Sequence, residues 1–237
     1  MNKISSVLLD LDGTLIDSLL DITDSINHMR RDFDLISLPE HIIKGFIGKG
    51  IDNLIKKSLY DYDSNSNNNT LDRESLFNKA KDLFSKYYCD YNGNKTVLYQ
   101  GVLEGLDKLR KEKLSLSIVT NKPTKPTLQI LQKLKLSHLF SYIICGDTCQ
   151  RCKPDPDQIL FACKQLNIRP EESIMIGDSS NDVIAARAAN LAAVLVLPYG
   201  YHNKKNILEL CANDVIEDLT KASKWIHSYN NLHYHSL

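Results

Sequence analysis

The residues that decide the fold stand near the start of the chain, in the stretch Val7-Leu8-Leu9-Asp10-Leu11-Asp12-Gly13-Thr14-Leu15-Ile16-Asp17-Ser18. The segment 4–9 is aliphatic apart from two serines, as a strand buried on both faces tends to be. Gly13 then lets the chain turn directly after two aspartates. Because ligands of open α/β sheets bind at the carboxyl ends of the strands, this stretch predicts a buried strand that delivers carboxylates to a binding edge.

Asp10 and Asp12 stand two residues apart, so a strand would direct both side chains to the same side. Two negative charges would then crowd beside a turn rich in backbone N–H groups, and a cation would relieve their repulsion. An isolated Asp-x-Asp-Gly sequence can also be only a polar turn. The buried strand before it and Thr14 after it favour a functional site.

Three further polar segments follow at predicted strand ends or in an adjoining loop. Thr120-Asn121-Lys122 follows the predicted strand 114–119, and Gly177-Asp178-Ser179-Ser180-Asn181-Asp182 follows the predicted strand 173–176. Between them, Lys153 lies in the stiff loop Cys152-Lys153-Pro154-Asp155-Pro156. Each segment alone could be a turn or a helix cap.

These four segments together make the chain resemble the haloacid dehalogenase superfamily of phosphotransferases. The resemblance implies that Asp10 is the nucleophile that takes a phosphoryl group, since water can release a labile aspartyl phosphate. It implies that Asp12 acts first as an acid toward the leaving oxygen and then as a base toward water. The expected activity is therefore that of a phosphomonoester hydrolase acting on a small phosphorylated metabolite.

The resemblance also implies a metal site and a phosphate site. It assigns the side chains of Asp10 and Asp178 and the main-chain carbonyl of Asp12 to the metal, with Asp182 just outside the direct ligands. Mg²⁺ is the expected cofactor, because it prefers an all-oxygen site of carboxylates, carbonyl, water and phosphate. The phosphate would be bound by Thr120, by the backbone N–H groups of Asn121 and Lys122, and by the charge of Lys153.

Within the superfamily, the chain is similar to phosphoglycolate phosphatases over nearly its whole length. The phrases that carry this similarity are Phe46-Ile47-Gly48-Lys49-Gly50, Leu98-Tyr99-Gln100-Gly101-Val102, Gly146-Asp147-Thr148 and Tyr199-Gly200-Tyr201. The similarity implies 2-phosphoglycolate as the substrate. A pyrophosphatase or sugar-phosphate phosphatase on the same core is the alternative, and a catalytically silent protein that binds a phospho-ligand is an alternative of a different class.

The periodicity of apolar residues predicts two domains. Residues 17–94 read as amphipathic helices without a clear strand, with an Asn- and Ser-rich surface loop at 61–70. From residue 101 onward, helices and strands alternate, which predicts a doubly wound parallel sheet. We therefore expect an α/β core formed by residues 1–16 and 95–237, of Rossmann-like type, with an all-helical cap domain at 17–94 inserted after the first strand.

Lys49 is the residue of the helical segment that we expect to contact the substrate. Its flanking glycines break the helical pattern, so a cationic side chain and backbone donors could meet a substrate carboxylate there. A plain turn between two helices is the alternative reading.

Composition excludes several other classes of function. The 29 Lys and Arg residues balance the 29 Asp and Glu residues among 237, so no nucleic-acid partner is expected. No apolar run approaches the ~20 residues of a membrane span, and no signal-peptide core precedes Asp10, so we expect a cytoplasmic protein, monomeric or homodimeric. The six cysteines are expected to be reduced, with Cys149 and Cys152 read as incidental loop thiols rather than a redox or metal pair.

Overall fold

The chain folds into two compact units in the computed structural model, which describes residues 3–61, 70–201 and 207–234. The first, called here the α/β unit, comprises Met1–Asp17 and Leu98–Leu237, and the second, called the helical unit, comprises Ser18–Val97. The sequence predicts the two changes of unit after residues 16 and 94, and in the structure they lie after Asp17 and Val97.

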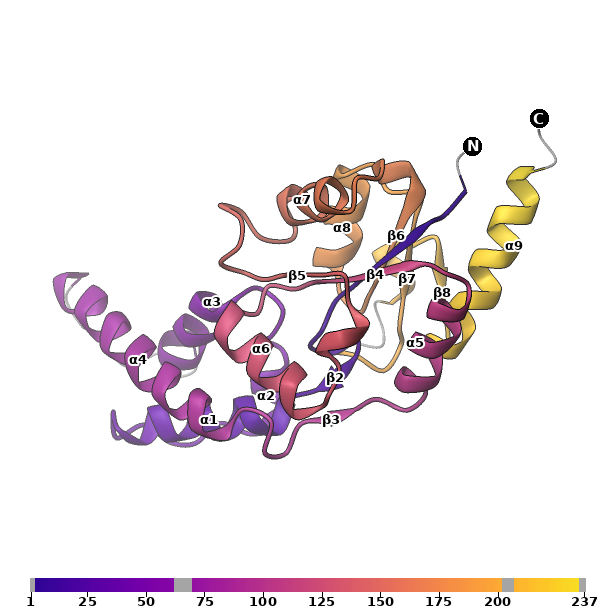
Figure 1. The fold of residues 1–237 in the computed structure, drawn as a ribbon. Coiled ribbons are helices and arrows are strands. Elements are labelled where there is room, and N and C mark those ends of the chain that lie inside the picture. Colours follow the sequence, from indigo (N-terminus) through magenta and orange to yellow (C-terminus); the bar gives the residue numbers. More distant parts are fainter. Residues whose placement is uncertain (1–2, 62–69, 202–206, 235–237) are drawn as a thin grey trace. The chain divides into compact units, whose positions relative to one another are not determined.

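The α/β unit is built on one six-stranded sheet in the order β5-β4-β1-β6-β7-β8 (Figure 1). All five neighbouring pairs run parallel, so the predicted parallel α/β sheet is confirmed. The strands, in sheet order, are β5 Tyr142–Ile144, β4 Ser115–Val119, β1 Ser6–Leu9, β6 Ser173–Gly177, β7 Ala193–Val196 and β8 Asp214–Val215.

Helices cover both faces of this sheet because its strands are apolar on both faces. In β1, Val7 and Leu9 join one buried cluster and Leu8 joins the other, as the two-residue period of a strand requires. The first cluster includes residues of α5 Val102–Lys111, α6 Thr124–Lys133 and α9 Ala222–Tyr234. The second includes residues of α7 Asp157–Leu166 and α8 Ser180–Ala188. Short 3-10 helices lie at Ser137–Leu139, Pro170–Glu172, Leu208–Leu210 and Leu219–Lys221.

The helical unit has its own core, formed mainly where α1 Leu19–Arg31 packs against α4 Thr70–Tyr91. In the sequence, α1 and α4 are separated by α2 Glu40–Lys44, α3 Ile51–Lys56 and a π-helical turn, Lys57–Asp61. Most of the Asn- and Ser-rich tract predicted as a loop, residues 62–69, lies outside the described residues.

Two short strands at the boundary of the units were not predicted. β2 Ile16–Asp17 and β3 Val97–Leu98 form a two-stranded sheet, and two residues are too few to produce a visible alternation. The loop just before β3 is bound by the fully buried carboxylate of Asp21 in α1. This carboxylate accepts hydrogen bonds from the backbone N–H groups of Gly93, Lys95 and Thr96 at 2.8, 2.9 and 3.0 Å. Asp21 thereby holds the last loop of the helical unit to α1.

No helix within the described ranges combines the length and apolar character needed to cross a lipid bilayer.

Candidate active site

The carboxyl ends of three neighbouring strands meet at one edge of the sheet. Leu9 lies in register with Ile118 of β4 and Ile176 of β6. Asp10 follows Leu9, and its backbone N–H donates to Ile176 O at 3.0 Å. Parallel pairing therefore brings Asp10, Thr120 and Asp178 to the same edge from positions far apart in the sequence.

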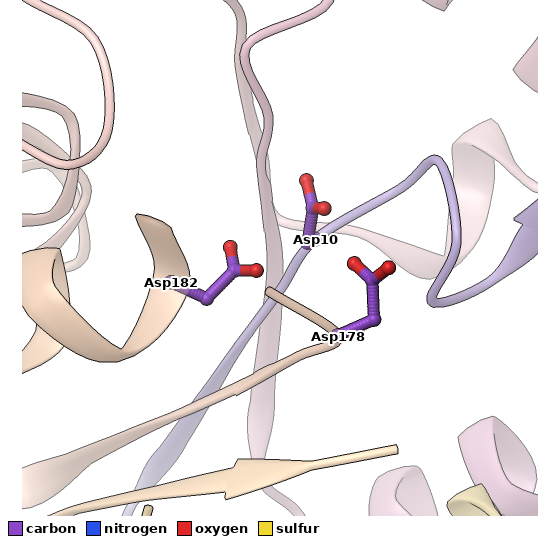
Figure 2. A group of neighbouring side chains, drawn as sticks. All are labelled: Asp10, Asp178 and Asp182. Carbon is purple, nitrogen blue, oxygen red and sulfur yellow. The ribbon is translucent and has the colours of Figure 1, made fainter. Parts of the chain in front are cut away.

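A cluster of three buried carboxylates occupies this edge. Asp10, Asp178 and Asp182 each have an oxygen within 4.8 Å of the others, and Figure 2 shows the three side chains converging. Asp10 and Asp178 come from the ends of β1 and β6, whereas Asp182 lies in the first turn of α8. Like charges this close, in a site from which water is largely excluded, repel one another unless a cation lies among them.

Lys153 is the cation that the protein itself supplies to the cluster. Its ammonium lies 2.8 Å from Asp10 Oδ1 and 2.6 Å from Asp182 Oδ1, and it donates to Val119 O at 2.7 Å. Burial opposes the charge of this side chain, which is only 4% exposed, but the two carboxylates outweigh burial and raise the pKa of Lys153. Lys153 is therefore a permanent positive charge that bridges two of the three aspartates.

Asp182 is held on both of its carboxylate oxygens. Oδ1 accepts from Lys153, while Oδ2 accepts from the backbone N–H and the hydroxyl of Ser179 at 3.0 and 2.7 Å. These last two bonds belong to the capping box that begins α8. With a fully buried side chain and both oxygens engaged, Asp182 anchors Lys153.

Asp178 is the carboxylate of the cluster without an ion pair inside the described ranges. Oδ2 accepts from the backbone N–H of Tyr201 at 2.6 Å, and the Thr14 hydroxyl donates to Oδ1 over a long 3.5 Å. Burial, together with the like charges of Asp182 and Asp10, raises its pKa well above the ordinary value. An additional cation would relieve this unfavourable state.

The composition of the cluster fits a hard divalent cation. When ionised, three carboxylates beside one ammonium carry two excess negative charges, which one divalent ion would neutralise. The donors are all carboxylate oxygens, the ligands that Mg²⁺ and Ca²⁺ prefer. The acidic cluster can therefore hold a metal ion.

Burial also perturbs the pKa of Asp10, the residue predicted to be the nucleophile. Desolvation raises that pKa to about 6, against the opposing influence of the Lys153 ammonium. The side chain keeps 12% exposure, so a substrate can reach it, and at neutral pH it is mostly ionised.

The side chain of Lys122 has a role that sequence reasoning missed. Lys122 was considered for its backbone N–H alone, but its buried ammonium contacts both oxygens of Asp12 at 2.9 and 3.2 Å. The Asp12 side chain remains 15% exposed. A signal was available, since Thr120 and Lys122 stand two residues apart at a strand end, the same spacing that drew attention to Asp10 and Asp12.

Thr120 and Asn121, predicted as phosphate donors, stand at the end of β4. Thr120 is 2% exposed, its backbone N–H donates to Ile144 O, and its hydroxyl accepts from Lys122 N. The Asn121 side chain donates to Lys153 O at 2.8 Å, so this residue also positions the loop that carries the lysine. Their contact with a phosphate group remains a prediction.

The sequence also drew attention to Lys49 and to the pair Cys149 and Cys152. Lys49 is exposed on the helical unit in the turn between α2 and α3, where it stands between Gly48 and Gly50, whose φ angles are positive at 100° and 82°. Its contact with a substrate remains a prediction. All six cysteines are free thiols, and Cys152 Sγ donates to Gly146 O at 2.9 Å. The interpretation of Cys149 and Cys152 as incidental loop thiols remains a prediction.

Known proteins match the chain over most of its length. The model of the family described as haloacid dehalogenase-like hydrolase matches residues 7–196. The chain is 37% identical over 224 residues to the phosphoglycolate phosphatase of Nitrosospira multiformis, an alignment that covers 94% of this chain and 96% of the relative. It is 36% identical over 213 residues to the phosphoglycolate phosphatase of Nitrosococcus oceani, with 90% and 92% covered.

Solved structures agree with these sequence matches. A crystal structure described as a predicted phosphoglycolate phosphatase from Haemophilus somnus superposes with a TM-score of 0.87 at 32% identity, covering 94% of this chain and 98% of the other. A crystal structure described as a predicted phosphatase from Clostridium acetobutylicum gives a TM-score of 0.81 at 28% identity, covering 96% and 100%.

Proposed function

Because the chain belongs to the haloacid dehalogenase-like hydrolase family, we propose that it is a magnesium-dependent phosphomonoester hydrolase acting through an aspartyl phosphate on Asp10. We propose 2-phosphoglycolate as the substrate, so that the products are glycolate and inorganic phosphate. Relatives aligned over nine-tenths of the chain or more carry the name phosphoglycolate phosphatase, which supports this choice.

Asp10 has the properties of the attacking group. It ends a buried strand, one oxygen is held by Lys153 at 2.8 Å, and the side chain is still reachable. In the first half-reaction, a carboxylate oxygen of Asp10 bonds to phosphorus while the bond between phosphorus and the glycolate oxygen breaks. The Lys153 ammonium keeps Asp10 oriented and offsets the negative charge that the substrate brings.

Asp12 would move the proton in both half-reactions. It gives a proton to the departing glycolate oxygen, and later takes one from the water that cleaves the aspartyl phosphate and releases phosphate. Its pairing with the buried Lys122 ammonium fixes the direction of the carboxyl group, and its partial exposure lets substrate and water reach it.

The acidic cluster would hold the metal through Asp10 and Asp178, with the main-chain carbonyl of Asp12 as a further ligand. Asp182 would support the site from outside the direct ligands, because both of its oxygens are already engaged. When bound, Mg²⁺ supplies positive charge that lets the carboxylates and the phosphate approach one another. Thr120, the backbone N–H groups of Asn121 and Lys122, and Lys153 would bind the phosphate oxygens.

The helical unit would then act as a cap domain that selects the substrate, with Lys49 as the residue that binds the carboxylate of 2-phosphoglycolate. Its exposed ammonium, set between two glycines, is available for such a contact. A charge-assisted hydrogen bond of this kind would favour a substrate with a carboxylate over one without.

The observation that carries the proposal is the convergence of Asp10, Asp178 and Asp182 around Lys153 at the carboxyl edge of the sheet. The test is release of phosphate, with and without Mg²⁺, from 2-phosphoglycolate, pyrophosphate and a set of sugar phosphates. Magnesium-dependent turnover that is fastest on 2-phosphoglycolate is expected. Preference for pyrophosphate or a sugar phosphate would overturn the substrate, and silence of the folded protein on every compound would favour a phospho-ligand-binding protein.

A further inference from the structure

The segment Tyr199-Gly200-Tyr201, which follows β7, forms one wall of the carboxylate cluster although none of its side chains belongs to the motifs of the site. The backbone N–H of Tyr201 donates to Asp178 Oδ2 at 2.6 Å, which is short for an N–H donor. This hydrogen bond is the closest polar contact of Asp178 among the described residues.

The approach of this segment to Asp178 depends on glycine. A β-carbon on Gly200 would overlap the side chain of Asp178, with its nearest atoms the Asp178 Cβ, Oδ2 and Cγ. A β-carbon on Gly13, where φ is +87°, would overlap the carboxylate of the same residue. Backbone therefore encloses Asp178 from two sides, and the missing side chains at both glycines make this possible.

The segment is also hydrogen-bonded to Thr14 and Asp17, in the stretch that follows Asp10 and Asp12. The phenol of Tyr201 donates to Asp17 Oδ1 at 3.1 Å, and the phenol of Tyr199 donates to Thr14 O at 3.0 Å. The rings of Tyr199 and Tyr99 lie 4.3 Å apart between centroids, a contact that further restricts the segment. The Tyr201 amide is thus held at a fixed position relative to the end of β1.

We propose that Tyr201 is a positioning residue that sets the metal affinity of Asp178, an inference that rests on the proposed role of Asp178 as a metal ligand. Rotation about the terminal carboxylate bond of an aspartate is soft, so an unrestrained group would present either oxygen. The Tyr201 amide holds Oδ2, whereas among the described residues Oδ1 has only the weak contact with the Thr14 hydroxyl. The phenol bond to Asp17 keeps the amide in place, as outer partners of metal ligands do.

The test is the Mg²⁺ concentration that gives half of the maximal rise in melting temperature, measured without substrate. Tyr201→Phe deletes the bond of the phenol to Asp17, together with its hydrogen bond to the Tyr99 side chain, and keeps the ring and the amide. We expect it to raise this concentration about three- to tenfold, below the full effect of removing an outer partner because the amide bond remains. Tyr87→Phe is the matched control, since its phenol also donates to an aspartate, Asp32 at 2.7 Å, in the helical unit.

Kinetics separate positioning from general damage. A positioning role predicts that Tyr201→Phe needs more Mg²⁺ to reach its half-maximal rate but recovers kcat close to that of the unmodified protein at saturating Mg²⁺. A fall in kcat that saturating Mg²⁺ does not restore would show that the substitution disturbs the site in another way, and would overturn the inference.

Asp17 offers a second, independent variant. Asp17→Asn keeps an oxygen to accept the phenol bond and should retain the metal response, whereas Asp17→Ala should raise the Mg²⁺ requirement in the same direction as Tyr201→Phe. If the two groups act through their shared bond, the double variant Asp17→Ala/Tyr201→Phe should be no worse than Tyr201→Phe alone. Additive losses would contradict the proposed connection.

The outcomes also distinguish this inference from the proposed function. If Mg²⁺ leaves the melting temperature of the unmodified protein unchanged, then the metal site itself is wrong and the inference falls with it. If Mg²⁺ stabilises the unmodified protein and Tyr201→Phe responds at the same concentration, the metal site stands and only the positioning role of Tyr201 is overturned.

Discussion

Replacing Asp178 by Asn should make the metal-free protein more stable. The substitution keeps the shape of the side chain and an oxygen for the Tyr201 N–H, but removes a buried charge that has no ion pair among the described residues. At a separation of 4.8 Å, an effective dielectric constant of about 20 gives a repulsion of roughly 3.5 kcal/mol between two full charges. Asp178 faces two such carboxylates, and the nearby Lys153 ammonium offsets about one of them.

We therefore expect the free energy of unfolding of the metal-free variant to rise by about 2 to 3 kcal/mol at about pH 8, or roughly 5 to 10 °C in melting temperature. The folded-state pKa of Asp178 is raised, so the penalty of its charge is present above that pKa and is lost as the pH falls through it. The difference between the two proteins should accordingly shrink as the pH is lowered toward about 4.

Thermal unfolding in the presence of a chelator, followed by titration with Mg²⁺, measures both effects. Mg²⁺ at about 100 times its dissociation constant should stabilise the unmodified protein by about 2.7 kcal/mol and the variant far less, so the order of melting temperatures reverses. Asp12→Asn is the control and should lower the stability of the metal-free protein, because it removes the carboxylate that neutralises the buried Lys122 ammonium. A metal-free Asp178→Asn protein less stable than the unmodified one would refute the reasoning.

The remaining predictions concern catalysis. Asp10→Asn should lower turnover at least about a hundredfold with an unchanged circular dichroism spectrum, because an amide cannot form the acyl phosphate; a rate above that limit argues against a nucleophile. Ca²⁺ should inhibit where Mg²⁺ activates, since it takes more ligands at longer distances, and equal rates with both ions would exclude this explanation. Lys49→Ala should lower kcat/KM for 2-phosphoglycolate roughly 10- to 100-fold but leave hydrolysis of p-nitrophenyl phosphate nearly unchanged; parallel losses would point to a general role. Asp10 must be ionised to attack, and burial raises its pKa to about 6, so kcat/KM at low Mg²⁺ should fall below that pH. Added Mg²⁺ should move this fall to lower pH, because a bound cation favours the ionised carboxylate. A fall at the same pH with and without Mg²⁺ would contradict a metal site that includes Asp10.

Local periodicity was sufficient to predict most elements of the α/β unit. The predicted strand 114–119 differs from β4 by one residue, and the predicted strand 173–176 differs from β6 by one residue. The unbroken apolar run of β1, which is buried along its whole length, and the three- and four-residue spacing of the helices arise from neighbours along the chain, so the sequence displays them directly. Periodicity does not predict the two-residue strands β2 and β3 or the π-helical turn after Lys56, because the backbone of these elements is determined by what packs around it.

The sequence by itself determined which residues stand at the strand ends: two aspartates after β1, a threonine after β4 and an aspartate after β6. Only the tertiary structure decided how charges are paired there, with Lys122 on Asp12 across 110 residues and Lys153 shared by Asp10 and Asp182. It also decided that Asp178 is held by a backbone amide instead of a cation. Ion pairing depends on distance and burial in space, and neither follows from the spacing of residues along a chain.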